Sequence, residues 1–352
     1  MSILDDPERC AAADPQQMRA LLDHFPAQVE EAAGIASRID LHIDSKISNI
    51  VISGLGGSAI GGDIVRSAVG QVLSIPLVVN RDYRLPRFVD DSTLVFACSY
   101  SGDTEETLSA YEQAKQAGAA VVCITSGGQL AVRASAGGNP VIKIPGGLPP
   151  RAAVGYSAVV LLGSLRALRL VPGIEETLRE VTRLVASLVS RYTATIPEAS
   201  NRAKTLARSL QGKIVAVYAA SGTLEAAAVR WRGQMEENAK NLAWHHLLPE
   251  MNHNELVGWK CPHDVIRNVG VVFLRDREDH PQVQRRFDFT REFVESRAGA
   301  VQEVWSEGNS PLARIFSVIS LGDYVSLYLA YLNAENPTPV EAIESLKKNL
   351  AQ

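Results

Sequence analysis

Apolar runs typical of β-strands alternate along this chain with runs typical of amphipathic helices, and this alternation limits the possible folds most strongly. In the first half, strand-like runs occupy 47–54, 76–80, 93–99 and 119–126. Between the last two, the run 104–118 places Leu108 and Tyr111 on one helical face and ends at a glycine. A strand that follows such a helix lies parallel to the strand before it. The pattern therefore predicts an α/β fold built on parallel sheets.

The same pattern restarts after a long helical stretch. Further strand-like runs occupy 213–223, 268–276 and 300–308, and a helical run occupies 223–243. We therefore expect two doubly wound, flavodoxin-like parallel-sheet subdomains with helices on both faces. The expected segments are an N-terminal helical lead-in (1–45), a first domain (46–152), a helical connector (153–211), a second domain (212–335) and a C-terminal helix (336–352).

Composition excludes several classes of partner. The formal net charge is −4 and the isoelectric point is near 6.0, so no basic surplus is available for nucleic acid or an anionic membrane. The N-terminus does not resemble a signal peptide, and no apolar stretch reaches the ~20 residues of a membrane span. The four cysteines form no CxxC pair. We expect a cytoplasmic protein with no nucleic-acid and no membrane partner.

A glycine-rich turn, GLGGSAIGGD (54–63), follows the first predicted strand. Such turns expose backbone N–H groups at a helix N-terminus, where the helix dipole favours an anion. The same glycines also fit the dinucleotide pattern GxGxxA, through Gly54, Gly56 and Ala59. That pattern expects an acidic residue near the end of the second strand. Here the second strand runs into Asn80 and Arg81 instead, which argues against a nicotinamide cofactor.

A loop rich in hydroxyl groups, CSYSGDTEET (98–107), follows another predicted strand. Parallel strands would bring Ser99, Ser101 and Thr104 near the glycine-rich turn, where they could surround a phosphate monoester. The alternative is that Ser101 and Thr104 only cap the next helix, with Glu106 or Thr107 completing a capping box. Three hydroxyl groups beside a glycine-rich turn favour the phosphate site.

The S-x-S-G-x-T pattern of this loop resembles the sugar-isomerase (SIS) phosphosugar-binding domain. Further segments are similar to the bifunctional phosphoglucose/phosphomannose isomerase family, in order from about residue 50 to the C-terminus. They are GLGGSAIGGD, CSYSGDTEET, GGLPPRAAVGYS (146–157), ENAKNLAWHHLLPEMNHNELVGW (237–259) and PTPVEAIESLKKNL. The resemblance implies two SIS-type domains and a C-terminal helix that returns to the active site.

The resemblance also implies a reaction, namely the interconversion of glucose 6-phosphate, mannose 6-phosphate and fructose 6-phosphate through a cis-enediol. Such a reaction requires a base, a ring-opening group and stabilisation of oxyanion charge, but neither a cofactor nor a metal. The phosphate group of the substrate would bind to Gly56, Gly57, Ser58, Ser99, Ser101 and Thr104.

Glu237 matches the base of the family. In the predicted helix it lies opposite an apolar stripe formed by Trp231, Met235, Ala239 and Leu242. Its neighbour Glu236 remains an alternative.

Three further residues match catalytic positions of the family. His253, 16 residues after Glu237, matches a ring-opening histidine that is contributed across a dimer interface, so the resemblance implies a homodimer. Lys347 matches a lysine that assists at the ring oxygen, with Lys348 as the alternative. Arg151 matches an arginine that could stabilise the enediolate, because a guanidinium stays charged and offers several donors.

The same residues bear on three other possible functions. His245, His246, Glu250 and His253 cluster in sequence, but adjacent histidines point to different faces of a helix or strand, which does not suit a metal site. A sugar-phosphate sensor that binds without turnover would need neither Glu237 nor His253. Amino-sugar isomerases often carry a cysteine nucleophile at position 2, where this chain has Ser2.

Overall fold

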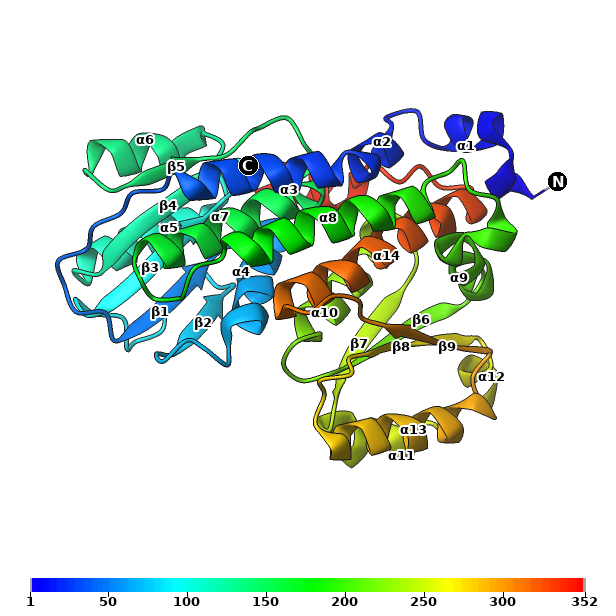
Figure 1. The fold of residues 1–352 in the computed structure, drawn as a ribbon. Helices are drawn as coiled ribbons and strands as arrows, with labels where there is room; N and C mark the ends of the chain where they lie inside the picture. The colour runs from blue at the N-terminus through cyan, green and yellow to red at the C-terminus, as the bar shows by residue number, and fades with distance from the viewer. Residues whose placement is uncertain (1, 351–352) are drawn as a thin grey trace. The chain divides into compact units, whose positions relative to one another are not determined.

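The computed structural model describes residues 2–350 and contains two parallel sheets. The first has the strand order β2-β1-β3-β4-β5 and the second has the order β7-β6-β8-β9 (Figure 1). Every pair of neighbouring strands in both sheets is parallel. The first order is that of flavodoxin-like folds, so the predicted fold class is confirmed.

Seven of the nine strands lie inside the runs predicted from the sequence. The strands of the first sheet are β1 (Asn49–Ser53), β2 (Leu77–Asn80), β3 (Thr93–Cys98), β4 (Ala120–Thr125) and β5 (Val141–Lys143). Those of the second are β6 (Ile214–Ala220), β7 (Ala243–Leu248), β8 (Val269–Arg275) and β9 (Ala300–Trp305). The sequence pattern did not indicate β5 or β7, which are both edge strands.

The chain forms two compact units, each named here by its sheet. The five-stranded unit consists of Phe25–Leu184 and Gly308–Ile315. The four-stranded unit consists of the residues up to His24, Val185–Glu307 and the residues from Phe316 onward. The division falls within two helices, α8 (Glu175–Tyr192) and α14 (Pro311–Leu332).

Helices pack on both faces of the sheet in the five-stranded unit. On one face, Val51, Val95 and Cys123 of the strands form a core cluster with Tyr111 and Leu130 of two helices. On the other face, Gly62 lies so close to Ile52 that a Cβ atom at Gly62 would come within 2.9 Å of that side chain. The helices are α3 (Phe25–Ser37), α4 (Gly56–Val69), α5 (Glu105–Gln116), α6 (Gly128–Ala136), η2 (Pro150–Ala152) and α7 (Val154–Ala167).

The four-stranded unit has its own aromatic core. Tyr218 of β6 and Phe273 of β8 pack with Phe287 of α13, Met251 and Trp259, and all five residues are buried. The helices up to the end of α9 are η1 (Ile3–Asp5), α1 (Pro7–Ala13), α2 (Met18–Asp23), η3 (Glu198–Ser200) and α9 (Arg202–Leu210). The later ones are α10 (Glu225–Glu237), η4 (Glu250–His253), α11 (Glu255–Gly258), α12 (His263–Ile266), α13 (Pro281–Glu295) and α15 (Glu341–Leu350).

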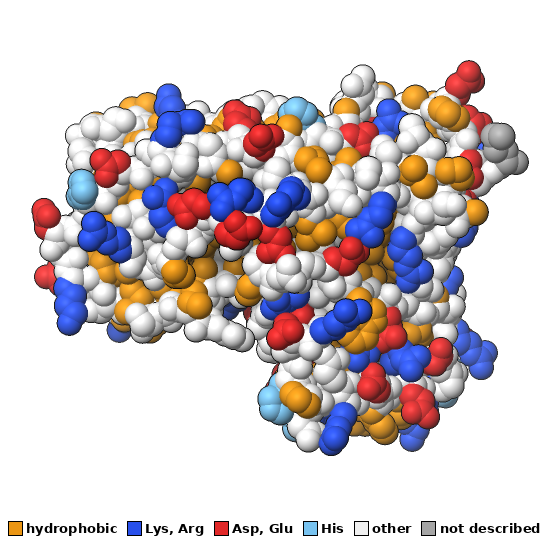
Figure 2. Space-filling view, viewed as in Figure 1, with side chains coloured by type: hydrophobic (Ala, Val, Ile, Leu, Met, Phe, Trp, Pro, Cys, Tyr) orange, Lys and Arg blue, Asp and Glu red, His pale blue; other side chains and the backbone are white. Residues whose placement is uncertain are grey.

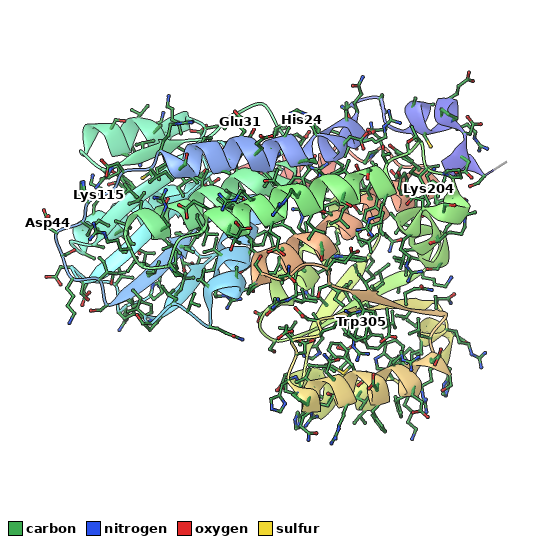
Figure 3. The ribbon with its side chains drawn as sticks, viewed as in Figure 1. His24, Glu31, Asp44, Lys115, Lys204 and Trp305 are labelled. Carbon is green, nitrogen blue, oxygen red and sulfur yellow. The ribbon has the colours of Figure 1, made fainter. Side chains whose placement is uncertain are left out.

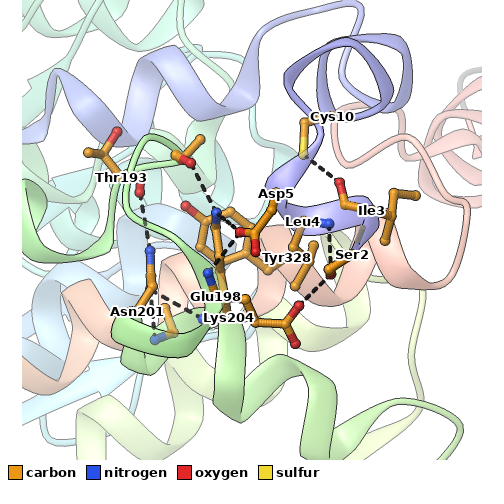
Figure 4. Close-up of polar contacts among 12 residues, drawn as sticks. Ser2, Ile3, Leu4, Asp5, Cys10, Thr193, Glu198, Asn201, Lys204 and Tyr328 are labelled. Atoms are coloured by element: carbon orange, nitrogen blue, oxygen red, sulfur yellow. Dashed lines mark hydrogen bonds and ion pairs between the residues drawn. The ribbon is translucent and has the colours of Figure 1, made fainter.

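The acidic N-terminal segment supplies partners for buried polar groups of the four-stranded unit (Figure 4). The Lys204 ammonium is fully buried and donates to Asp5 Oδ1 at 3.1 Å and to the Ala194 carbonyl oxygen at 2.9 Å. The Tyr331 hydroxyl of α14 donates to Asp14 Oδ2 at 3.1 Å. A buried charge is costly unless it is paired, so this segment is integral to the unit.

Helix α14 corrects one expectation from the sequence. Its 22 residues are long and apolar enough to cross a membrane by length and composition, although no such stretch was identified in the sequence. However, 94% of its most apolar window is buried inside the protein, as is typical of a core helix. On the face shown in Figure 2, acidic and basic side chains are interspersed rather than gathered by sign.

Candidate active site

The strand order of the five-stranded unit indicates where a ligand binds. The order β2-β1-β3 means that the chain moves outward in opposite directions from the β1–β3 pair, in which Ser53 lies opposite Ala97. In doubly wound sheets, ligands bind outside the carboxyl ends of the strands at this switch point. The glycine-rich turn follows β1 and the hydroxyl loop follows β3, so the fold brings the two predicted phosphate-binding segments to one edge.

Among the described residues, no side chain caps the start of helix α4 after β1. The residue before the helix is Leu55, whose hydrocarbon side chain cannot cap it, and the first turn reads Gly56-Gly57-Ser58-Ala59, all uncharged. Gly56 has φ +51°, which favours glycine, and a Cβ atom at Gly57 would come within 2.4 Å of the Pro150 carbonyl oxygen. The N–H groups of this turn can therefore bind an anion.

The three hydroxyl side chains of this loop differ in burial and in their hydrogen bonds. Ser99 is buried, and its Oγ donates to Thr104 Oγ1 at 2.9 Å and accepts from the Gly102 N–H at 3.0 Å. Ser101 is exposed and accepts from the Asp103 N–H at 3.2 Å. Thr104 is the residue before α5, but its hydroxyl does not cap the first turn of this helix. The capping alternative is therefore wrong for these two residues.

Contacts within the five-stranded unit join the two turns to the segment that carries Arg151. Ser58 Oγ accepts from the Tyr100 N–H at 3.2 Å, and the Tyr100 hydroxyl accepts from the Leu148 N–H at 3.0 Å. Burial raises the pKa of Tyr100, so this hydroxyl stays protonated. Arg151 is buried in η2 and follows Pro150, which lies against Gly57. The unit thus gathers the predicted phosphate-binding residues and Arg151.

Helix α10 of the four-stranded unit is fixed by buried polar contacts with α14. The Arg230 guanidinium donates to both oxygens of Asp323, at 3.0 Å and 2.7 Å, and Gln234 donates to Asp323 Oδ1 at 3.1 Å. One turn further on, Asn238 Nδ2 donates to Ser326 Oγ at 3.0 Å. All five residues are buried. These contacts set the rotation of α10 and the direction of its other side chains.

Glu237, the last residue of α10, lines an open cavity of about 520 Å³. Glu236 and Lys240 line it too, together with the segment from Glu335 to Ile343. The Lys240 ammonium donates to the carbonyl oxygens of Glu237 at 2.7 Å and Pro337 at 3.4 Å. This lysine therefore links the end of α10 to the C-terminal segment.

The two neighbouring carboxylates differ in their surroundings. Glu237 is half-buried, whereas Glu236 is exposed and lies 3.7 Å from Arg232. Partial burial raises the pKa of Glu236; the charge of Glu237 adds to this, although Arg232 opposes it. Both carboxylates line the cavity, so the choice of Glu237 over Glu236 remains a prediction.

Helix α15 starts beside this cavity and carries both candidate lysines. Its first residues, from Glu341 to Ile343, belong to the cavity wall. Lys347 and Lys348 follow in the same helix, and both are exposed. The helix therefore lies close enough to Glu237 for a C-terminal lysine to belong to the same site, and the roles of these lysines stay predictions.

His253 lies at the opposite end of β7 from Glu237. The chain enters β7 at Leu242, whose carbonyl oxygen accepts from the Val215 N–H at the start of β6. It leaves β7 at Leu248, whose carbonyl oxygen accepts from the Ser221 N–H beyond the end of β6. Six strand residues span roughly 17 Å. Within one chain, this unit therefore does not bring the exposed His253 to Glu237. His245 and His246 lie in β7 on opposite faces.

A doubly wound parallel sheet, with an uncapped helix start and hydroxyl groups at its switch point, is the architecture expected of a protein of the SIS type. Residues 43–136 match the model of the SIS domain, and residues 199–350 match that of the bacterial phospho-glucose isomerase C-terminal SIS domain.

The chain belongs to the bifunctional phosphoglucose/phosphomannose isomerase family. It is 45% identical to the bifunctional phosphoglucose/phosphomannose isomerase of Caldicellulosiruptor bescii, over 94% of this chain and 97% of that protein. It is 36% identical to the enzyme of that name from Aquifex aeolicus, over 86% of this chain and 90% of the relative. Its fold is similar to that of a hypothetical protein from Thermus thermophilus, with a TM-score of 0.73, 16% identity, and coverage of 98% and 94% of the two chains.

Proposed function

We propose that this protein interconverts glucose 6-phosphate and mannose 6-phosphate with fructose 6-phosphate. The observation that carries the proposal is the position of Glu237, on a helix fixed by buried contacts and at the wall of an open cavity. A base must be held at a fixed position relative to the two carbons between which it moves a proton.

The substrate phosphate binds at the β1/β3 switch point of the five-stranded unit. The N–H groups of Gly56 and Gly57 at the start of α4, with the hydroxyl groups of Ser58, Ser101 and Thr104, bind the phosphate oxygens. Ser99 acts on the phosphate indirectly, because its hydroxyl already donates to Thr104 and accepts from Gly102 and so holds both in place.

Glu237 moves a proton between C1 and C2 through a cis-enediol. Starting from the aldose, its carboxylate removes the C2 proton and returns it to C1, while the hydrogen on the C2 oxygen must be lost and one must be gained at O1. Arg151 stabilises the negative charge that develops on the enediolate oxygens. His253 and Lys347 act at the ring oxygen, where ring opening breaks the O5–C1 bond. Because C2 is planar in the enediol, both epimeric aldoses lead to the same intermediate. The reaction requires no cofactor.

The active form is a homodimer in which His253 comes from the second chain. The observation that supports this is the separation of His253 from Glu237 by the full length of β7. In a dimer with twofold symmetry, the loop of each chain would reach the site of the other. We also propose a reducing, cytoplasmic location, which the four free cysteines suit.

The experiment that tests the reaction supplies purified protein with fructose 6-phosphate and excess EDTA and quantifies the aldose phosphates formed. Both glucose 6-phosphate and mannose 6-phosphate are expected. Glu237→Gln should lower kcat for both by about 10²–10⁴-fold, because an amide cannot accept the proton, while Glu236→Gln serves as the matched control. Binding without turnover would leave a sugar-phosphate sensor, and loss of activity only in Glu236→Gln would move the role of the base to Glu236.

The shared site is tested by mixing inactive variants. Glu237→Gln and His253→Ala chains, each inactive alone, are refolded together in equal amounts. Half of the dimers are then mixed, and one of their two sites has both native residues, so about a quarter of the native activity should return. No recovery, with mixed dimers shown by native mass spectrometry, would contradict a site shared between chains.

A further inference from the structure

The carboxylate of Glu255 is the centre of a hydrogen-bond network beneath the His253 loop. It accepts from the Tyr218 hydroxyl of β6 and from Trp244 Nε1 of β7 at 3.0 Å, and its Oε2 lies 2.7 Å from His246 Nδ1 of β7. Trp259 Nε1 in turn donates to the Tyr218 hydroxyl at 3.1 Å. Hydrogen bonds to a charged acceptor are about twice as strong as neutral ones, so this carboxylate fixes the loop to two strands.

The Tyr218 hydroxyl remains a hydrogen-bond donor to Glu255. Burial, and then the negative charge of Glu255, raise the pKa of Tyr218 well above its usual value, so the phenol remains a donor. Glu255 Oε2 and His246 Nδ1 lie 2.7 Å apart, which is hydrogen-bond distance. Polar groups of Tyr218, Trp244 and His246 therefore converge on one carboxylate.

The residues on each side of His253 are held in place as well. Met251 is buried in the aromatic core of the unit, and Asn252 Nδ2 donates to Thr290 Oγ1 of α13 at 2.8 Å. Asn254 Oδ1 accepts from the Glu255 N–H at 2.6 Å and so begins α11. His253, between these anchored residues, is exposed.

We propose that Glu255 is a positioning residue, which holds the loop so that the His253 imidazole is presented to the substrate. The proposal rests on the proposed function, because it assumes that His253 acts in ring opening. Glu255 itself touches neither substrate nor reacting atoms. Its replacement should therefore affect turnover through His253 alone, since a displacement of about 1 Å in a catalytic group can cost ~10²-fold in rate.

The test uses the full-length protein and the isosteric change Glu255→Gln, which places an N–H group where a donor now points. We expect kcat to fall by about 10–100-fold with KM for fructose 6-phosphate changed by less than about threefold. Glu255→Asp, which keeps the charge, should recover part of the loss. Asp264→Asn, which changes an exposed carboxylate in nearby α12, is the matched control and should leave kcat unchanged.

A double-mutant cycle separates positioning from general damage. In the His253→Ala background, Glu255→Gln should cause no further loss of kcat, because the group through which it acts is gone. In mixed dimers, Glu255→Gln chains should recover activity with Glu237→Gln chains but not with His253→Ala chains. Equal fold losses in both backgrounds, or full activity of Glu255→Gln, would overturn the positioning role.

The two proposals fail in different ways. If His253→Ala kept full activity while Glu255→Gln lost it, the role of His253 in the proposed function would fall, and so would positioning through it. If His253→Ala were inactive and Glu255→Gln fully active with an unchanged melting temperature, only the positioning role would fall. If Glu255→Gln did not fold, Tyr218→Phe, which removes one donor from the same carboxylate, would be measured in the same cycle with the same expectation.

Discussion

Helices α4 and α10 occupy equivalent places in two sheets of similar topology, yet the predicted site residues lie at opposite ends of them. Each follows the strand next to the switch point of its sheet, β1 in one unit and β6 in the other. The start of α4 faces the predicted phosphate site, whereas the last residue of α10 is the predicted base. The comparison shows that two sheets of similar topology can carry predicted site residues at opposite ends of equivalent helices.

The carboxyl edge of the four-stranded sheet differs in charge from that of the five-stranded sheet. The first turn of α10 contains Glu225, whereas the first turn of α4 is uncharged. At the end of β8, the Arg275 guanidinium is already bound to Glu303 at 2.5 Å and Asp288 at 3.0 Å. It also lies 4.6 Å from the ring centre of Trp305, labelled in Figure 3. At this edge, the Arg275 guanidinium is therefore already paired with carboxylates and is less available to a phosphate.

The largest expected effect is a loss of stability when the buried ion pair that fixes α10 is broken. Asp323→Ala leaves the Arg230 guanidinium buried without its carboxylate, which should lower the free energy of unfolding by about 3–5 kcal/mol. Urea denaturation measures the loss. Glu295→Ala, which removes an exposed 4.0 Å ion pair in α13, is the control and should change stability by less than about 0.5 kcal/mol. Similar values for the two variants would contradict the fixation of α10 by this pair.

A negative charge should distinguish the two carboxyl edges. Ser101→Asp places a carboxylate at the predicted phosphate site and should raise KM for fructose 6-phosphate about 100-fold through repulsion of the dianion. Ser221→Asp makes the same change at an exposed serine after β6 and should alter KM less than about twofold. Steady-state kinetics on both variants decide the matter. An equal rise in both would mean that the phosphate does not bind at the β1/β3 edge.

The space around a glycine differs between α4 and α10. A Cβ atom at Gly61 of α4 would lie 2.6 Å from Ser157 Oγ and 2.7 Å from its Cβ, so Gly61→Ala should lower stability by about 1–3 kcal/mol. Gly233 of α10 has open space around the same position, and Gly233→Ala should raise stability by about 0.5–1 kcal/mol. Thermal unfolding of the pair should shift in opposite directions, and shifts of one sign would contradict the close approach of α4.

The smallest expected effect is a pH-dependent change in stability caused by Glu236, near the end of α10. Because the pKa of Glu236 is raised in the folded protein, its charge costs stability once the pH rises above the usual glutamate range. Glu236→Gln should therefore raise the melting temperature slightly at pH 7 and lose this advantage near pH 4. The side chain is 41% exposed and screened by solvent, so we expect a few tenths of a kcal/mol at most. If the gain in melting temperature of Glu236→Gln grew as the pH fell, the raised pKa of Glu236 would be contradicted.

The sequence predicted what depends on local pattern and missed what depends on distant contacts. Seven strands followed from apolar runs, but β7 reads Ala-Trp-His-His-Leu-Leu, and its two central histidines hide the strand pattern. The predicted helix 223–243 ends at Glu237, and Leu242, assigned to its apolar stripe, is 68% exposed. An edge strand needs less apolar surface than a central one, so its sequence carries a weaker signal.

In the candidate site too, features set by local sequence were predicted and features set by distant contacts were missed. The glycine-rich turn and the hydroxyl loop were evident because each is a short contiguous motif that directly follows an apolar strand-like run. The internal role of Ser99 could not be predicted, because it depends on which hydroxyl group is buried. Glu255 was missed for a similar reason: its partner Tyr218 lies 37 residues away, and no short motif connects a tyrosine in one strand with a glutamate after the next.

The burial of Lys204 against Asp5 has a consequence for synthesis of the chain on the ribosome. Asp5 precedes Lys204 by 199 residues, and Asp14 precedes its partner Tyr331 by 317 residues. At about 5–20 residues per second, these acids wait roughly 10–60 s for the groups that they bind. This segment is therefore made well before the groups that it binds, and its charged side chains keep it hydrated until those groups are made.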